Sequence, residues 1–133
     1  MADAPTPPRD DGIKIEHLSH SFGANRVLDD ISLSIRTREI VTLLGPSGCG
    51  KTTTLRIIAG LEELQHGRIS VDGRVLADGT VNVPPEERSV SLLFQDFALF
   101  PHLTVIENVI FGLGNWPPEE RPARALHVLG QVG

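Results

Sequence analysis

The stretch that decides the fold reads Gly45-Pro46-Ser47-Gly48-Cys49-Gly50-Lys51-Thr52. A glycine, four further residues and then Gly-Lys-Thr match the pattern of a phosphate-binding loop. Glycines let backbone N–H groups turn inward around phosphate oxygens, and a helix that begins here adds the positive end of its dipole. The motif therefore predicts that the chain binds the phosphates of a nucleotide.

Side chains at the end of the loop supply the remaining chemistry. The Lys51 ammonium would neutralise the β- and γ-phosphates. The Thr52 hydroxyl would complete the coordination of Mg²⁺, which prefers oxygen ligands in an octahedron, and Thr53 would add a hydrogen bond. We find no convincing histidine partner for Cys49, so we interpret it as a small residue that lets the loop pack rather than as a nucleophile.

The residues on either side of the loop predict the order strand, loop, helix. Residues 40–44 are nearly all apolar, which is typical of a strand buried on both faces within a parallel sheet. Residues 51–61 place apolar side chains at helical spacing, and Gly60 lies close to where that helix would end. This context argues against the alternative of a glycine-rich turn with an exposed lysine.

An antiparallel sheet is predicted around this core. Residues 13–18 and 31–35 alternate apolar and polar side chains, the period of half-buried strands, and residues 21–25 would form the loop between them. Residues 67–76 predict two short strands around Asp72-Gly73, a dipeptide favoured in tight hairpins.

The last third of the chain predicts one more strand and two helices. Residues 90–94 are apolar and end at the polar pair Gln95-Asp96. A helix is predicted from residue 105 to about 112, where Thr104 and Glu107 have the spacing of a capping box, and another from about residue 122 to 132.

Composition limits the possible classes of protein. The 133 residues suit one domain, and 40% hydrophobic with 22% charged residues is typical of soluble globular proteins. A net charge of −5 makes nucleic acid a poor principal partner. The apolar runs are shorter than the roughly 18 residues of a membrane-spanning helix. A single cysteine agrees with a reducing compartment. Residues 1–12 are expected to form a disordered tail.

Residues 43–61 strongly resemble the phosphate-loop (Walker A) region of ATP-binding cassette (ABC) transporter ATPases. Upstream, Phe22-Gly23 and residues 27–33 look like the family's aromatic loop, so the resemblance implies that Phe22 stacks on adenine and Val27 packs at the same base. It assigns nucleotide contacts to Gly45, Pro46, Ser47, Gly48, Cys49, Gly50, Lys51, Thr52 and Thr53, with ATP and Mg²⁺ as cofactors.

Residues 94–109 closely resemble the Q-loop of bacterial importer subunits, most like those for ferric iron, polyamines, sulfate or phosphonates. Gln95 stands where the family's glutamine contacts Mg²⁺ and water, so the resemblance implies a catalytic role for Gln95 beside Lys51. It also implies that residues 97–102 face the transmembrane permease, which would place the chain in the cytoplasm on the inner face of the plasma membrane.

The resemblance implies a partial α/β P-loop NTPase core with an antiparallel β-subdomain and the start of a helical subdomain. We expect a nucleotide-binding part at residues 13–94 and a Q-loop and helical part at residues 95–133. The family's signature, Walker B and switch-histidine motifs are absent from the sequence, so we expect no turnover by the chain alone. Residues 41–44 would then keep an unpaired strand edge, and marginal stability is expected.

Three alternative functions are considered for this chain. The first is the N-terminal part of an importer ATPase that binds MgATP, hydrolyses it when complete, and pairs with a second ATP-binding subunit. The second is a non-catalytic nucleotide-binding or interaction fragment. The third is a small kinase whose phosphoryl-acceptor pocket would be built from residues 95–133. The resemblance of residues 94–109 to the Q-loop argues against it.

Overall fold

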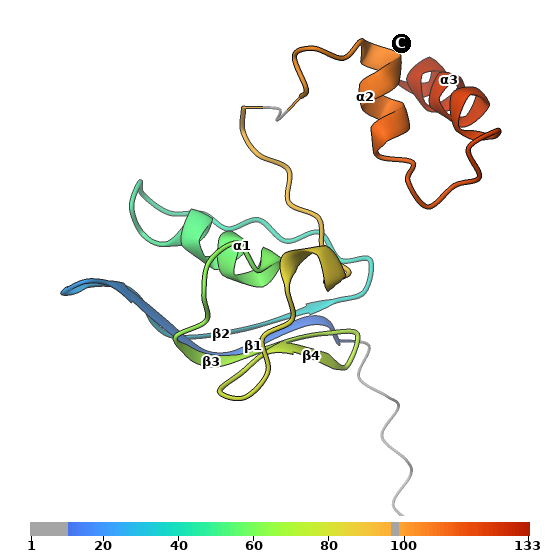
Figure 1. Ribbon diagram of the computed structural model, residues 1–133. Coiled ribbons are helices and arrows are strands. Elements are labelled where there is room, and N and C mark those ends of the chain that lie inside the picture. The colour runs from blue at the N-terminus through green and yellow to red at the C-terminus, as the bar shows by residue number, and fades with distance from the viewer. Residues whose placement is uncertain (1–10, 97–98) are drawn as a thin grey trace, which may run out of the picture. The chain divides into compact units, whose positions relative to one another are not determined.

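The computed structural model describes residues 11–96 and 99–133 of the chain, which form two compact units that divide after Leu92 (Figure 1). Most of the predicted disordered tail lies outside the described residues. Its last two residues, Asp11 and Gly12, instead begin a strand, because Asp11 pairs with Arg36 of β2 and extends the first hairpin.

The first unit is built on a four-stranded antiparallel sheet. Its strands are β1 (Asp11–Phe22), β2 (Asn25–Arg36), β3 (His66–Val71) and β4 (Arg74–Ala77), in the order β2-β1-β3-β4. The predicted antiparallel sheet and the hairpin at Asp72-Gly73 are thus confirmed. The predicted loop at residues 21–25 is too long, because Phe22 already pairs with Asn25 across a two-residue turn.

One helix covers this sheet and completes the core of the unit. Helix α1 (Lys51–Ala59) ends at Gly60, as predicted. Its buried residues Ile57 and Ile58 pack into one cluster with strand residues, namely Ile15, Leu18, Leu28 and Ile69. The burial of these branched aliphatic side chains fixes α1, and with it the glycine-rich loop, against the sheet.

A buried arginine ties the end of α1 to the segment after β4. Arg88 is only 7% exposed and follows the short 3-10 helix η1 (Pro85–Glu87). Its guanidinium donates to the backbone carbonyl oxygens of Ile57 and Ile58 at 2.8 and 2.9 Å. It also donates to two oxygens of the preceding loop, Val83 O at 2.7 Å and Asn82 Oδ1 at 2.9 Å. Burial lowers the pKa of Arg88, and sequence reasoning gave no sign of this contact.

The two predicted core strands are wrong as elements of this structure. Residues 40–44 form no strand, and Ile40 and Leu44 are 95% and 87% exposed. Residues 90–94 form none either, and Leu93 is 84% exposed. A strand forms only where a neighbour takes up its backbone N–H and C=O groups, and within residues 11–96 and 99–133 neither segment has such a neighbour.

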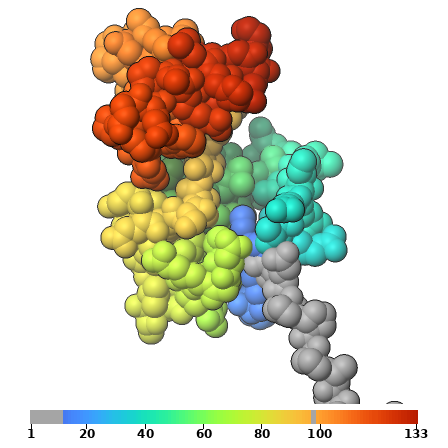
Figure 2. Space-filling view, turned by 90° about the vertical axis from the view of Figure 1, so that its right-hand side faces the viewer, coloured from blue at the N-terminus to red at the C-terminus, as the bar shows by residue number. Residues whose placement is uncertain are grey.

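The second unit contains two helices whose side chains gather into a compact body, orange to red in Figure 2. Helix α2 (Val105–Phe111) begins with the predicted capping box of Thr104 and Glu107, and α3 (Arg121–Val132) agrees with the predicted last helix. Ala125 of α3 is fully buried. Among the described residues, none of the helices has the length and apolar character needed to cross a membrane.

Candidate functional site

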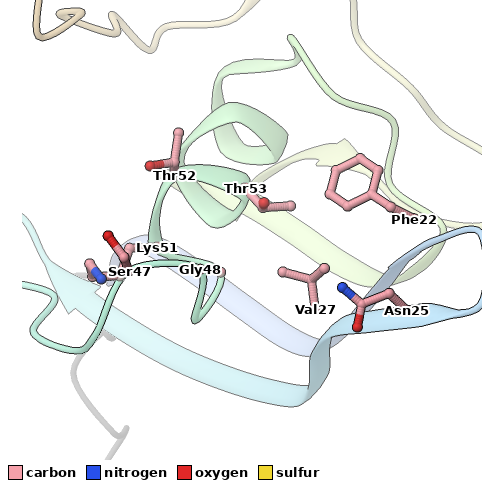
Figure 3. A pocket seen from close by; sticks show the side chains of 9 residues that line it. Phe22, Asn25, Val27, Ser47, Gly48, Lys51, Thr52 and Thr53 are labelled. Carbon is pink, nitrogen blue, oxygen red and sulfur yellow. The ribbon is translucent and has the colours of Figure 1, made fainter.

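A pocket of about 390 Å³ lies between the β1–β2 hairpin and the start of α1 (Figure 3). Its lining comprises Phe22, Asn25, Val27, Ser47, Gly48, Gly50, Lys51, Thr52 and Thr53. All of these lining residues except Asn25 were singled out from the sequence. The structure therefore brings the predicted aromatic loop and the predicted phosphate loop to one cavity, although 22 residues lie between Phe22 and Gly45 in the sequence.

Gly50 is the point where the loop packs against the hairpin. Its φ of 94° lies in the left-handed region, and a Cβ built on it would lie 2.4 Å from Leu28 Cδ2 and 3.0 Å from Val27 O. Only glycine fits this conformation and this close approach. The tight contact places the first turn of α1 directly beside β2.

Lys51 is folded over its own loop. Its ammonium donates to the carbonyl oxygens of Gly45 and Pro46, both at 2.7 Å, and lies 3.3 Å from Cys49 Sγ. An ammonium has three N–H donors, and thiol sulfur is a weak acceptor. One donor is thus held only weakly, and the positive charge is fixed at the loop. Gly45, Pro46 and Cys49 do not line the pocket themselves but hold Lys51.

The start of α1 offers further free polar groups to the pocket. No side chain caps the helix at Gly50, so the backbone N–H groups of its first turn keep their capacity to bind an anion. In the part of the chain that the structure describes, the hydroxyls of Ser47, Thr52 and Thr53 have no hydrogen-bond partner. Thr54 differs, because its buried hydroxyl donates to Gly50 O at 2.9 Å and stabilises the first turn.

Phe22 forms the apolar end of the pocket with Val27. The Phe22 ring is 50% exposed, and one edge contacts the His20 ring at a centroid distance of 4.7 Å and an interplanar angle of 70°. His20 is buried, and neither of its ring nitrogens has a hydrogen-bond partner. Nε2 lies 3.8 Å from Glu62 Oε1, which is too far for a hydrogen bond.

Gln95 lies in the second unit, in an exposed turn. Its catalytic and metal-binding role stays a prediction. Of the segment expected to face a permease, residues 97 and 98 lie outside the described residues. The remainder borders an apolar pocket of about 340 Å³, lined by Leu99, Phe100, Pro101, Leu103, Val105, Asn108 and Val109.

Asn108 holds this segment in place, and sequence reasoning missed it. Its Oδ1 accepts from Phe100 N–H at 2.9 Å, while Nδ2 donates to the carbonyl oxygens of Phe100, Leu103 and Thr104 at 3.0 to 3.2 Å. The available signal was an asparagine within a helix, where its tendency to bond nearby backbone disfavours it. Asn25 was also missed, because a single polar residue after a turn has no motif.

A glycine-rich loop that leads into a helix, beside a hairpin that carries an aromatic ring, defines the class of P-loop nucleotide-binding proteins. Comparison with known families identifies which family of this class the chain belongs to. The family model described as ABC transporter matches residues 28–133, and the chain belongs to this family.

Several curated import proteins are similar to the chain. A spermidine/putrescine import ATP-binding protein of Haemophilus influenzae is 48% identical over 122 residues, which are 90% of this chain and 32% of that protein. An Fe(3+) ions import ATP-binding protein of Rhizobium etli is 46% identical (91% and 35%), and a sulfate/thiosulfate import ATP-binding protein of Ralstonia nicotianae is 50% identical (85% and 29%). The chain spans about a third of the length of these relatives.

Solved structures support the same fold. The dimeric structure of a bacterial ABC transporter cassette matches with a TM-score of 0.69 and 28% identity, over 89% of this chain and 56% of that one. A dimeric post-hydrolysis state of that cassette bound to ADP and Pi matches with a TM-score of 0.67. The predicted fold class, a partial ABC ATPase core with an antiparallel subdomain, is confirmed by these matches.

Proposed function

We propose that this chain binds MgATP in the pocket between the β1–β2 hairpin and α1, as part of an ATP-binding subunit that powers solute import. The observation that carries the proposal is the convergence on one cavity of an exposed aromatic ring, Phe22, and a phosphate-type loop ending in Lys51. An adenine and a triphosphate need these two kinds of surface at opposite ends of one site.

The residues present fit the triphosphate. Gly48 and Gly50 line the cavity with backbone rather than side chain, and the first turn of α1 has no capping side chain. Phosphate oxygens would accept hydrogen bonds from these backbone N–H groups. Lys51 would turn its weakly held third donor from Cys49 Sγ toward a phosphate oxygen and keep its bonds to Gly45 and Pro46.

The residues present also fit a magnesium ion that arrives with the nucleotide. Thr52 lines the pocket with a hydroxyl that is free within the described residues, and a hydroxyl oxygen is a ligand that Mg²⁺ accepts. Groups of three or more His, Cys, Asp or Glu residues suited to a metal are absent from the described residues, so Thr52 would share the ion with phosphate oxygens. Bound there, Mg²⁺ neutralises charge on the phosphates. A metal-binding and catalytic role for Gln95 is proposed only from the resemblance of its loop to the family's Q-loop.

Phe22 and Val27 would hold the base. An adenine stacked on the half-exposed ring removes apolar area of both groups from water at little cost in side-chain entropy, since phenylalanine has only two rotatable bonds. The edge contact with His20 restricts the ring further.

We further propose the partners of the complete subunit. Residues 97–102, of which Leu99, Phe100 and Pro101 line the apolar pocket, would receive a transmembrane permease at the cytoplasmic face of the membrane, in keeping with the relatives that are import ATP-binding proteins. A second ATP-binding subunit would complete the site, in keeping with the dimeric cassettes that the fold resembles.

Titration of the purified chain with a fluorescent ATP analogue and Mg²⁺ tests the proposal. Lys51→Ala should weaken binding by at least about tenfold, because a charge-assisted phosphate contact contributes about 1.5 to 3 kcal/mol. Lys14→Ala is the matched control, since Lys14 is the only other lysine and pairs with Glu16 away from the pocket. Equal affinity of the Lys51→Ala variant and the unaltered chain would refute the proposed site.

Phosphate release measured on the same samples separates the two leading functions. We propose that these 133 residues bind ATP without turning it over, since the motifs that activate water in the family are not among them. Lys51-dependent turnover by this chain would show that the residues present suffice for hydrolysis and would overturn this part of the proposal.

A further inference from the structure

We infer that Asn25 is a specificity-determining residue, which hydrogen-bonds the N6 and N7 edge of an adenine stacked on Phe22. The inference rests on the proposed function and deepens it, because it names the base that the pocket selects.

The position of Asn25 follows from the register of the hairpin. Asn25 begins β2 and pairs directly with Phe22, the last residue of β1. Side chains of directly opposed residues in an antiparallel pair lie on the same face, with Cβ atoms about 5 Å apart. Val27 follows two residues later and lines the same cavity (Figure 3). The base end of the pocket therefore combines a ring, an aliphatic side chain and one carboxamide.

The carboxamide of Asn25 is available for a ligand. Within residues 11–96 and 99–133 it makes no hydrogen bond to protein, and its side chain is exposed at the rim of the pocket. A base that stacks on Phe22 would therefore meet an amide whose donors and acceptor are bonded only to water. Exchange of that water for a base edge of matching pattern keeps every hydrogen bond made.

The local backbone does not explain an asparagine at this position. Gly23 and Ala24 form the turn, and Gly23, with a φ of 60°, supplies the left-handed first residue that a type II′ turn requires. Asn25 lies outside these two residues, its φ is not positive, and asparagine is disfavoured in strands. Its chemistry toward the pocket is the remaining reason for the residue.

The hydrogen-bond pattern of a carboxamide matches adenine. The Asn25 side chain offers one acceptor oxygen and an NH₂ donor. Adenine presents the N6 amino donor beside the N7 acceptor, and asparagine bonds both at once. Guanine presents two acceptors, O6 and N7, on that edge, so the amide oxygen would be left facing an acceptor. A pocket with Asn25 should therefore prefer ATP to GTP.

Three ligands distinguish base recognition from phosphate binding. The Mg²⁺ complexes of ATP, GTP and inorganic tripolyphosphate are titrated into the unaltered chain and Asn25→Ala by calorimetry. We expect the unaltered chain to bind ATP about three- to tenfold more tightly than GTP, the range of one or two exposed hydrogen bonds. Asn25→Ala should lose this preference and bind tripolyphosphate unchanged.

Ser21→Ala is the matched control, because Ser21 lies in the same hairpin, pairs with Arg26 and does not line the pocket. It should keep the preference for ATP. Three outcomes would overturn the inference and leave the proposed site intact. The unaltered chain could bind ATP and GTP equally, or Asn25→Ala could retain the preference for ATP. Asn25→Ala could also lose as much affinity for tripolyphosphate as for ATP. Absence of Lys51-dependent binding of all three ligands would instead refute the proposed function, and the inference with it.

Discussion

Replacement of Arg88 by methionine should strongly destabilise the first unit. Methionine keeps much of the unbranched apolar stem, which fills the same space, but it removes the guanidinium and its four hydrogen bonds. Two of these bonds end on Ile57 O and Ile58 O, in the last turn of α1. The last four carbonyl groups of a helix have no partner within it, so Arg88 acts as the C-terminal cap of the helix that carries the phosphate loop.

The expected loss is about 3 to 5 kcal/mol of unfolding free energy. Hydrogen bonds to a charged donor contribute about 1.5 to 3 kcal/mol each, but four bonds from one group are not additive. The favourable position of a cation at a helix C-terminus adds about 0.3 to 1 kcal/mol, and relief of guanidinium desolvation acts in the opposite direction. Domains are stable by about 5 to 15 kcal/mol, so the loss is a large share of the total.

Urea unfolding followed by circular dichroism measures this loss, with an unchanged slope as the sign that the unfolded state is not affected. Arg74→Met is the matched control, because exposed Arg74 makes one long bond, 3.5 Å to Glu87 O, and should cost less than about 0.5 kcal/mol. Arg88→Lys should fall between the two, since a lysine reaches fewer of the four acceptors. A loss below about 1 kcal/mol for Arg88→Met would refute the capping role.

Two further predictions concern a buried and an exposed titratable group. His20→Leu should stabilise the chain by about 1 kcal/mol in the same urea assay, because a buried ring with two unsatisfied nitrogens is replaced by an apolar side chain; destabilisation would mean that His20 has a partner, such as Glu62, in solution. In the capping box of α2, hydrogen bonds from Thr104 N–H and Oγ–H lower the pKa of Glu107 below its ordinary value of 4.5. The ionised Glu107 side chain should therefore stabilise α2 fully above pH 4.5, and this stabilisation should be lost as the pH falls through the lowered pKa. NMR titration of Glu107 and amide exchange in α2 measure this loss. A Glu107 pKa at or above 4.5 would contradict the prediction.

Local signals in the sequence predicted the elements that depend on neighbouring residues. The capping box at Thr104, the hairpin at Asp72-Gly73 and the helix that ends at Gly60 each rest on residues within a few positions of one another. The phosphate-type loop belongs with them, since its glycines act on their own backbone. Phe22 and Val27 could be added only through resemblance to a family, because nothing local relates them to a loop that begins 23 and 18 positions after them.

The remaining features depend on which segments meet in space. Residues 40–44 have the composition of a buried strand, yet they form none here, because a strand exists only with a hydrogen-bonded neighbour. Arg88 bonds the carbonyls of Ile57 and Ile58, 31 and 30 residues away, and Asn108 bonds carbonyls four to eight residues away. A sequence does not show which carbonyls lack a donor. By itself the sequence determined that this chain has a phosphate-type loop, a capped helix and hairpins. Tertiary structure alone decided that Phe22, Asn25 and the loop share one pocket, because β1, β2 and α1 come together only through the burial of their common apolar core.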